Sequence, residues 1–135
     1  MKTLIPLVVL LLLSFQTKIF SQPCLPEGIT FSTQTQIDNF QSDYPGCTEI
    51  EGSVTISGSD ITHLNGLNVL TSIGGDLSIF ENDSLTSLTG LGNLTSVGGN
   101  VRIAGNPVLT SVSALNNLTY IPGNLEIGAF YAQNF

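Results

Sequence analysis

The fold is decided by GGDLSIFENDSLTSLTGLGNLTSV (74–97), a stretch whose pattern recurs on both sides. It is preceded by EGSVTISGSDITHLNGLNVLTSI (51–73) and followed by GGNVRIAGNPVLTSVSALNNLTYI (98–121), so the period is 23 to 24 residues. A partial fourth copy (122–135) opens with PGNLEIGAF. A period of this length is typical of chains that wind into stacked coils, each contacting only its neighbours. We therefore look for function on a surface rather than in one central active site.

Two spacings of apolar residues occur within each copy, which we call a coil. Apolar and polar residues first alternate, as in Val54-Thr55-Ile56, and alternation predicts a short strand. Apolar residues then come at every third position, a spacing that an α-helix would spread around most of its circumference. We therefore predict extended or 3₁₀-like arcs after each strand. The residues expected to face inward stand in register: Val54, Leu77, Val101 and Leu125; Ile56, Ile79, Ile103 and Ile127; Ile61, Leu85 and Leu109; and so on through Ile73, Val97 and Ile121.

The first residues predict export of the chain. MKTLIPLVVLLLLSF has one lysine and then an apolar run of about 12 residues, which is typical of a secretory signal peptide and too short to span a membrane comfortably. We expect a signal peptide over residues 1–22, with cleavage near Ser21 or Gln22. The remaining chain, expected to be secreted or held at the cell surface without membrane insertion, is long enough for one small domain.

The charge balance argues against binding of polyanions. Beyond residue 22 the sequence holds ten acidic residues and one basic residue, Arg102, which gives a net charge of −9. Nothing else is left to neutralise phosphates, so we expect no nucleic-acid partner. The acidic balance favours solubility.

The segment before the coils predicts a cap over residues 23–49. In an exported chain, two cysteines indicate a Cys24–Cys47 disulfide, and closing that loop stabilises by about 3 kcal/mol on the chain-entropy estimate. A helix is expected over about 33–44, because Thr33 and Gln36 form a capping-box pattern and apolar residues share one helix face. The positions 23 residues before the inward Leu67, Leu70 and Ile73 are occupied by Tyr44, Cys47 and Ile50. We expect these residues to face inward as well.

Several polar motifs have a structural interpretation. Asn82 and Asn106, with Ser59 in the shorter first coil, stand where a buried side chain can bond the backbone of a turn. Two threonine rows stand just outside inward leucines, where β-branched residues suit strands, although such rows could also fit ice or a crystalline polysaccharide. These rows are Thr62, Thr86 and Thr110, and Thr71, Thr95 and Thr119.

The acidic residues Asp60, Asp76, Glu81 and Asp83 predict a solvated edge. They lack the spacing of a calcium loop, although paired carboxylates could indicate a glycosidase. With His63 as the sole histidine, no Ser-His-Asp constellation can be assembled. We therefore expect no catalytic residues, no metal and no cofactor.

The outward strand positions predict a binding face. The middle position of successive strands is occupied by Thr55, Ser78, Arg102 and Glu126, and the next outward position of the second strand is Phe80. Phe80 and Arg102 are the residues least expected on a surface that only faces solvent. Aromatic and arginine side chains often anchor protein interfaces. We predict Phe80, Arg102, Ser78 and Thr55 as the candidate binding face.

The opening Cys24, the expected helix ending at Tyr44, YPGCTEIEGSVTI (44–56) and NNLTYIPGNLEI (116–127) together resemble the receptor L-domain. That domain is the ligand-binding β-solenoid of growth-factor and insulin receptors, and similar leucine-rich proteins are exported by bacteria or found in fungal cell walls. The resemblance covers residues 24–127. It implies a mainly β, single-domain, right-handed β-solenoid of leucine-rich-repeat-like coils over residues 50–135, with one N-terminal capping helix.

The end of the sequence departs from that family. In the fourth coil the asparagine position falls on Phe130, within AFYAQNF (129–135). We expect a longer protein of which this is the N-terminal part, in preference to a cap built from Phe130, Tyr131 and Phe135. An uncapped last coil predicts edge-to-edge contact there.

These observations predict an exported binding or adhesion module that is not an enzyme and that recognises a protein or glycan through one face of the coils. The alternative is a structural repeat spacer within a larger secreted protein. A third and less favoured interpretation is an enzyme acting on polysaccharides.

Overall fold

The computed structural model describes residues 22–128, and in this part the architecture is mainly β, with two parallel sheets. We call them sheet A and sheet B. Sheet A contains β1 (Gln22–Cys24), β3 (Cys47–Ile50), β5 (Ser72–Ile73) and β7 (Ser96–Val97). Sheet B contains β2 (Ile29–Phe31), β4 (Val54–Ile56), β6 (Leu77–Phe80), β8 (Val101–Ala104) and β9 (Leu125–Gly128). The predicted signal peptide, apart from Gln22, and the proposed cap of Phe130, Tyr131 and Phe135 lie outside the described residues.

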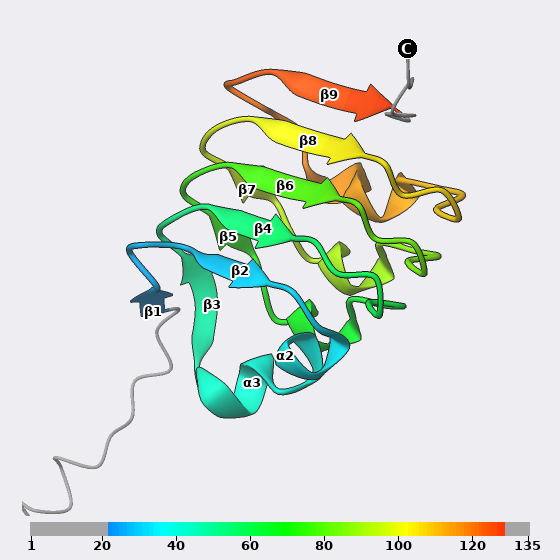
Figure 1. The fold of residues 1–135 in the computed structure, drawn as a ribbon. Helices are drawn as coiled ribbons and strands as arrows, with labels where there is room; N and C mark the ends of the chain where they lie inside the picture. Colours follow the sequence, from blue (N-terminus) through cyan, green and yellow to red (C-terminus); the bar gives the residue numbers. More distant parts are fainter. Residues whose placement is uncertain (1–21, 129–135) are drawn as a thin grey trace, which may run out of the picture.

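The predicted register between coils is confirmed. Val54 pairs with Leu77, Leu77 with Val101, and Val101 with Leu125, so each strand of sheet B lies beside its counterpart in the next coil. Figure 1 shows these strands as a ladder of parallel arrows, with β9 outermost. Parallel pairing follows because every coil runs in the same direction and returns to the same edge after one period.

The arcs with an apolar residue at every third position contain short 3₁₀ helices. They are η1 (Asn65–Leu67), η2 (Thr89–Leu91) and η3 (Ser113–Asn117). A 3₁₀ helix repeats every three residues, so this spacing keeps one edge of the arc pointing inward. The prediction of extended or 3₁₀-like arcs is confirmed.

The inward positions form a continuous core. Leu64, Leu67 and Leu70 in the first coil and Leu88, Leu91 and Leu94 in the second are fully buried. The third-coil counterparts of this set, Val112, Leu115 and Leu118, are only partly buried. Burial in this architecture therefore depends on a coil on each side.

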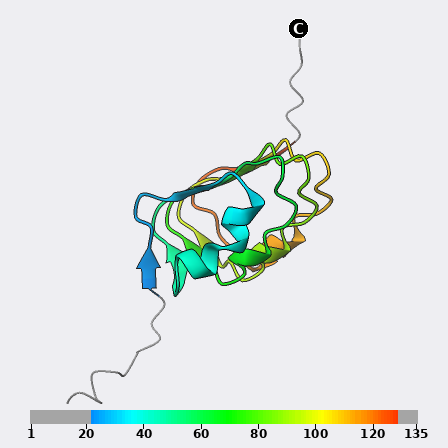
Figure 2. The same ribbon diagram turned by 60° about the horizontal axis from the view of Figure 1, so that its bottom comes forward.

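Two short helices replace the single predicted helix. They are α2 (Gln34–Asp38) and α3 (Phe40–Asp43), separated by Asn39 with φ −87° and ψ −1°. The predicted capping box is present, since Thr33 accepts from the Gln36 N–H and the Gln36 side chain accepts from the Thr33 N–H. Asparagine is a poor helix former, and the turn at Asn39 separates the two segments. Viewed from their end of the coils, both helices lie across the outline of the stack (Figure 2).

The inward register holds for Cys47 and Ile50 but not for Tyr44. Ile50 pairs with Ile73 and is buried, as is Cys47. Tyr44 is 38% exposed and rests on the buried Phe40 ring, with 5.5 Å between ring centroids. The prediction for Tyr44 was wrong because the break at Asn39 places it beyond the end of α3 instead of on a continuous helix face.

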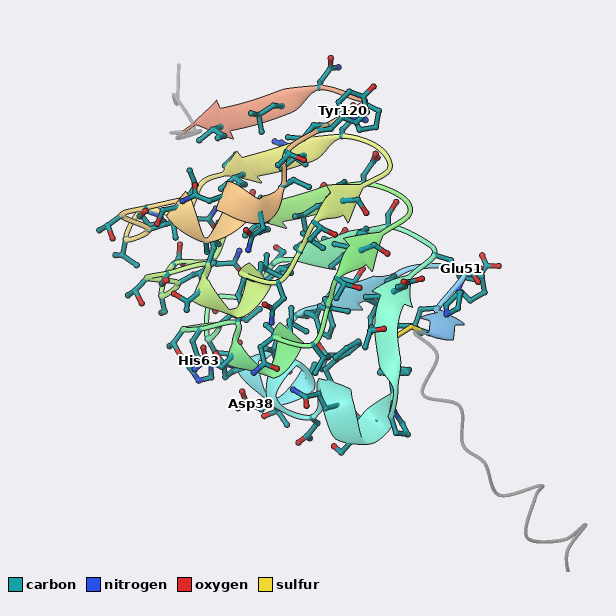
Figure 3. All side chains as sticks on the ribbon, turned by 180° about the vertical axis from the view of Figure 1, so that it is seen from behind. Asp38, Glu51, His63 and Tyr120 are labelled. Carbon is teal, nitrogen blue, oxygen red and sulfur yellow. A yellow bond between two sulfur atoms is a disulfide. The ribbon has the colours of Figure 1, made fainter. Side chains whose placement is uncertain are left out.

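The predicted Cys24–Cys47 disulfide is confirmed, with 5.7 Å between the Cα atoms. It joins β1 to the start of β3, its neighbour in sheet A. Figure 3 shows the bond in yellow beside β1. The disulfide therefore ties the N-terminal segment to the coil stack.

Asn82 closes the turn after β6 and is fully buried. Its Oδ1 accepts from the Gly58 N–H at 2.9 Å, and its Nδ2 donates to the carbonyls of Ile56 at 3.0 Å and Phe80 at 3.1 Å. Buried backbone groups need such partners, because each one left unpaired costs free energy comparable to a lost hydrogen bond. Asn82 therefore provides hydrogen-bond partners for backbone groups of two successive coils.

Asn106 repeats this arrangement one coil later. Its Oδ1 accepts from the Asn82 N–H at 3.1 Å, and its Nδ2 donates to the carbonyls of Ile79 and Ala104. We call Asn82 and Asn106 the asparagine ladder. The prediction that these asparagines satisfy turn backbone is confirmed.

The assignment of Ser59 to the same ladder was wrong. The Gly58 N–H donates to Asn82 Oδ1, just as the Asn82 N–H donates to Asn106 Oδ1. Gly58, and not Ser59, is therefore the first-coil equivalent of Asn82. The later coils carry an additional residue between the strand and the ladder position, at Glu81 and Gly105. Both have positive φ, 55° and 63°. This additional residue accounts for the difference between 23 and 24 residues.

Replacing Asn82 by alanine tests the ladder. The N82A change leaves the Gly58 N–H and two carbonyls without their buried partner, so we expect a loss of about 2–4 kcal/mol in unfolding free energy. Urea denaturation followed by circular dichroism measures it. The matched control is N93A, because the exposed Asn93 makes one bond, from Nδ2 to the Asn68 carbonyl. Equal losses for both variants would contradict the ladder's role.

The positive φ at Glu81 predicts opposite effects at two equivalent positions. A side chain in this conformation costs about 1–2 kcal/mol, partly offset by the greater freedom that glycine has when unfolded. We expect Glu81→Gly to raise the unfolding free energy by about 0.5–1 kcal/mol, and Gly105→Ala to lower it by about 1 kcal/mol. Thermal denaturation measures both, and destabilisation by Glu81→Gly would contradict the argument.

Candidate binding face on sheet B

The outer face of sheet B is a column of outward side chains in register. Thr55 pairs with Ser78, Ser78 with Arg102, and Arg102 with Glu126. The next residue in each strand, such as Ile56 after Thr55 and Ile79 after Ser78, is buried, because successive side chains of a strand point to opposite faces. The predicted column therefore faces away from the core.

Phe80 and Arg102 contact each other across two coils. The Arg102 guanidinium carbon lies 5.5 Å from the centroid of the Phe80 ring, within the range of a cation–π interaction. On its other side, Arg102 Nε lies 3.5 Å from Glu126 Oε2. Both charged side chains remain 43–48% exposed, so this ion pair contributes at most about 1 kcal/mol to stability. The contacts orient Arg102 more than they stabilise the fold.

Most of the predicted face is brought together. Phe80, Arg102 and Ser78 form one cluster over β6 and β8, while Thr55 lies one strand further along the column. Glu126 was expected to face outward but was not predicted as a member of the binding face, although the register places it beside Arg102. The sequence alone does not show that the long Arg102 side chain bridges Phe80 and Glu126. That these residues bind a ligand stays a prediction.

A shallow hollow of about 290 Å³ adjoins the cluster. It is lined by residues of three successive coils, among them Asp76, Ser78, Asn100, Arg102, Asn124 and Glu126. Carboxylate and amide oxygens accept hydrogen bonds, and the guanidinium presents donors in a planar fork. The lining of the hollow thus combines hydrogen-bond acceptors with one cation.

A second ladder fixes one side of this hollow. Asn100 donates its N–H to Asp76 Oδ1 at 2.7 Å, and Asn124 donates its N–H to Asn100 Oδ1 at 2.8 Å. We call Asp76, Asn100 and Asn124 the corner ladder. Because each member bonds the backbone of the next coil, this edge is held at the inter-strand spacing of about 4.8 Å.

The acidic residues do not gather into a metal site. Asp76 belongs to the corner ladder, and Asp60 accepts from the Gln34 N–H at 3.1 Å. Over residues 22–128, no group of three or more His, Cys, Asp or Glu side chains is arranged to hold a metal ion. His63 lies near α2, where the Gln34 side chain bonds its carbonyl and approaches its ring (Figure 3).

Three members of the threonine rows form hydrogen bonds to a neighbouring segment through their hydroxyls. Thr71 and Thr95 each donate the hydroxyl to the carbonyl of the threonine one coil earlier, Thr48 and Thr71, at 3.2 and 3.0 Å. The Thr62 hydroxyl donates to Gln34 Oε1. These contacts give Thr62, Thr71 and Thr95 a structural role.

Comparison with known families identifies the class of protein. A family model described as the receptor L domain matches residues 46–134, and the chain belongs to that family. No curated protein and no solved structure matches the chain. In the described part, no helix is both long and apolar enough to cross a membrane.

A double-mutant cycle tests the Phe80–Arg102 contact. We expect Phe80→Ala and Arg102→Ala to show a coupling of about 0.5–1 kcal/mol in unfolding free energy, the range of an exposed cation–π pair. Chemical denaturation of the four proteins measures it. As a control, Arg102→Ala combined with Tyr120→Ala should be additive, since Tyr120 lies outside sheet B. Additivity in the Phe80 cycle would contradict the contact.

Proposed function

We propose that the chain is an exported binding module that recognises a protein or glycan through the outer face of sheet B. The observation that carries this proposal is the contact of Phe80 with Arg102 on the outward side of adjacent coils. Aromatic and arginine side chains supply much of the binding energy at interfaces. Here they stand on a rigid ladder of strands, which lowers the ordering cost of binding.

Membership of the receptor L domain family supports this proposal. The family's domains are ligand-binding modules in the extracellular parts of receptors, and a binding role without catalysis agrees with that. The Cys24–Cys47 disulfide supports an extracellular location, because disulfides persist in oxidising compartments. Secretion through a signal peptide at 1–22 and adhesion at a cell surface are parts of the same proposal.

We also infer that residues 23–49 cap a right-handed solenoid formed by residues 50–135. The hand follows from the general preference of parallel β–crossover–β connections for right-handed winding. The position of α2 and α3 at one end of the coils supports the cap (Figure 2). An experimental structure in which β4 connects to β6 with the opposite hand would contradict this inference.

The test is a screen of the purified protein on arrays of defined glycans and of secreted proteins. For a ligand that binds, the double variant Phe80→Ala/Arg102→Ala should lose at least tenfold in affinity, because both anchors of the face are removed. Tyr120→Ala is the matched control, since it removes an exposed aromatic ring that lies outside sheet B. Biolayer interferometry measures the dissociation constants.

Three results would redirect the proposal. Equal affinity of the wild type and the double variant would place binding on another face. Absence of any ligand on both arrays would favour the structural spacer. Turnover of a polysaccharide by the purified protein would show an enzyme.

A further inference from the structure

The hollow on the outer face of sheet B is lined by two parallel columns of side chains. It spans three successive coils, whose strands β6, β8 and β9 lie side by side (Figure 1). Neighbouring coils are about 4.8 Å apart and the columns are two residues apart along the chain, so the hollow covers about 10 Å by 7 Å. The columns are the corner ladder (Asp76, Asn100 and Asn124) and the outward residues Ser78, Arg102 and Glu126.

The size and polarity of the hollow suit one small polar unit of a larger ligand. Its volume is about 290 Å³, and apart from Val101 its lining residues are polar or charged. Sites that enclose a whole drug-sized molecule measure about 300–1,000 Å³ and are lined mainly by apolar side chains. A ligand of this hollow therefore enters it with one hydrogen-bonding unit, while the rest of the ligand lies on the surrounding face.

The lining offers hydrogen-bonding groups that the described chain does not use. Asp76 Oδ1 accepts from the N–H and the Nδ2 of Asn100, at 2.7 and 3.3 Å, whereas no group of residues 22–128 donates to Asp76 Oδ2. In the same part of the chain, the Ser78 hydroxyl and the Asn124 side-chain amide have no hydrogen-bond partner. Because the corner ladder already holds the Asp76 carboxylate, its second oxygen is presented to a ligand at little ordering cost.

The charges around the hollow disfavour charged ligands of either sign. Two carboxylates, Asp76 and Glu126, face one cation, Arg102, and the sequence beyond residue 22 is strongly acidic. An anionic group such as a uronate or a sulfate is therefore repelled both at a distance and inside the hollow. A cation would meet Arg102, which lies on the central strand and is held there by Phe80 and Glu126. A neutral ligand avoids both penalties.

We propose that the hollow binds one sugar unit of a neutral glycan, that is, a saccharide without carboxylate or sulfate groups. This inference rests on the proposed function and narrows its ligand class. A hydroxyl group can both donate and accept a hydrogen bond, so neighbouring sugar hydroxyls match Asp76 Oδ2, the Ser78 hydroxyl and the Asn124 amide. The next sugar unit reaches Phe80, which lies two residues beyond Ser78 on the same face of β6 and offers an apolar ring for packing.

Titration of the isotope-labelled protein with defined probes, followed by NMR, tests the proposal. The neutral probes are tetrasaccharides of glucose, mannose, galactose and N-acetylglucosamine. The charged probes are tetragalacturonate and a tetralysine peptide. We expect saturable binding of at least one neutral probe, with shifts of the backbone amides of Ser78, Asn100 and Arg102, and no binding of either charged probe.

Two variants and a matched control locate the site. Asp76→Asn keeps the Oδ1 acceptor of the corner ladder, as Asn100 does one coil later, but replaces Oδ2 by a neutral donor. It should weaken binding of the neutral probe by about tenfold or more, and Ser78→Ala should weaken it by about threefold, because a hydrogen bond to a charged group is the stronger one. Ser96→Ala, the control, removes the hydroxyl of an exposed serine of β7 in sheet A and should leave binding unchanged. Thermal denaturation checks that each variant is folded.

The results that overturn this inference are distinct from those that overturn the proposed function. Binding of no neutral probe, or of a charged probe in its place, would contradict a neutral-glycan site. Equal affinity of the wild type, Asp76→Asn and Ser78→Ala would place the sugar outside the hollow. If instead a secreted protein binds and Phe80→Ala/Arg102→Ala abolishes that binding, this inference fails while the proposed function stands. If neither a saccharide nor a protein binds, both fail.

Discussion

The structure depends on the buried amide of Asn82. Each coil must turn sharply after its strand, and the turn leaves backbone groups that no strand can pair. The amide carries both a donor and an acceptor, so Asn82 bonds its own strand and the preceding coil together. Asn106 repeats this arrangement, so each turn is stabilised by hydrogen bonds between two neighbouring coils. Stability in repeat architectures is accordingly carried by interfaces between neighbours.

Side-chain contacts differ between the first and the last coil of the described residues. At the first coil, Gln34 of α2 accepts the N–H groups of Thr62 and His63, and the disulfide joins Cys24 to Cys47. At the last described coil, Ile127 and Leu125 are exposed instead. The outer face of sheet B lies between these ends, where Phe80 and Arg102 sit on strands paired on both sides. That position gives the proposed binding face its rigidity.

Features that recur from coil to coil could be predicted from the sequence. The register, the 3₁₀ arcs, the asparagine ladder and the Cys24–Cys47 pair all follow from periodicity or from counting. Features set by a single local conformation could not be predicted from the sequence. The turn at Asn39 divides the helix and exposes Tyr44, and the positive φ at Glu81 shifts the ladder from Ser59 to Gly58. The outward positions of the four predicted face residues follow from strand alternation, but the Arg102–Glu126 contact depends on a rotamer that no spacing encodes.

Native-state hydrogen exchange of the Gly58 and Asn82 amides tests the central claim most directly. Both N–H groups donate to a ladder oxygen, so they should exchange only through global unfolding, as slowly as the amides of β4 and β6. Asp83, an exposed neighbour in the same turn, provides an internal reference for fast local exchange. Exchange of Gly58 and Asn82 at the rate of Asp83 would contradict the account, because the turns would then open without loss of the coil stack.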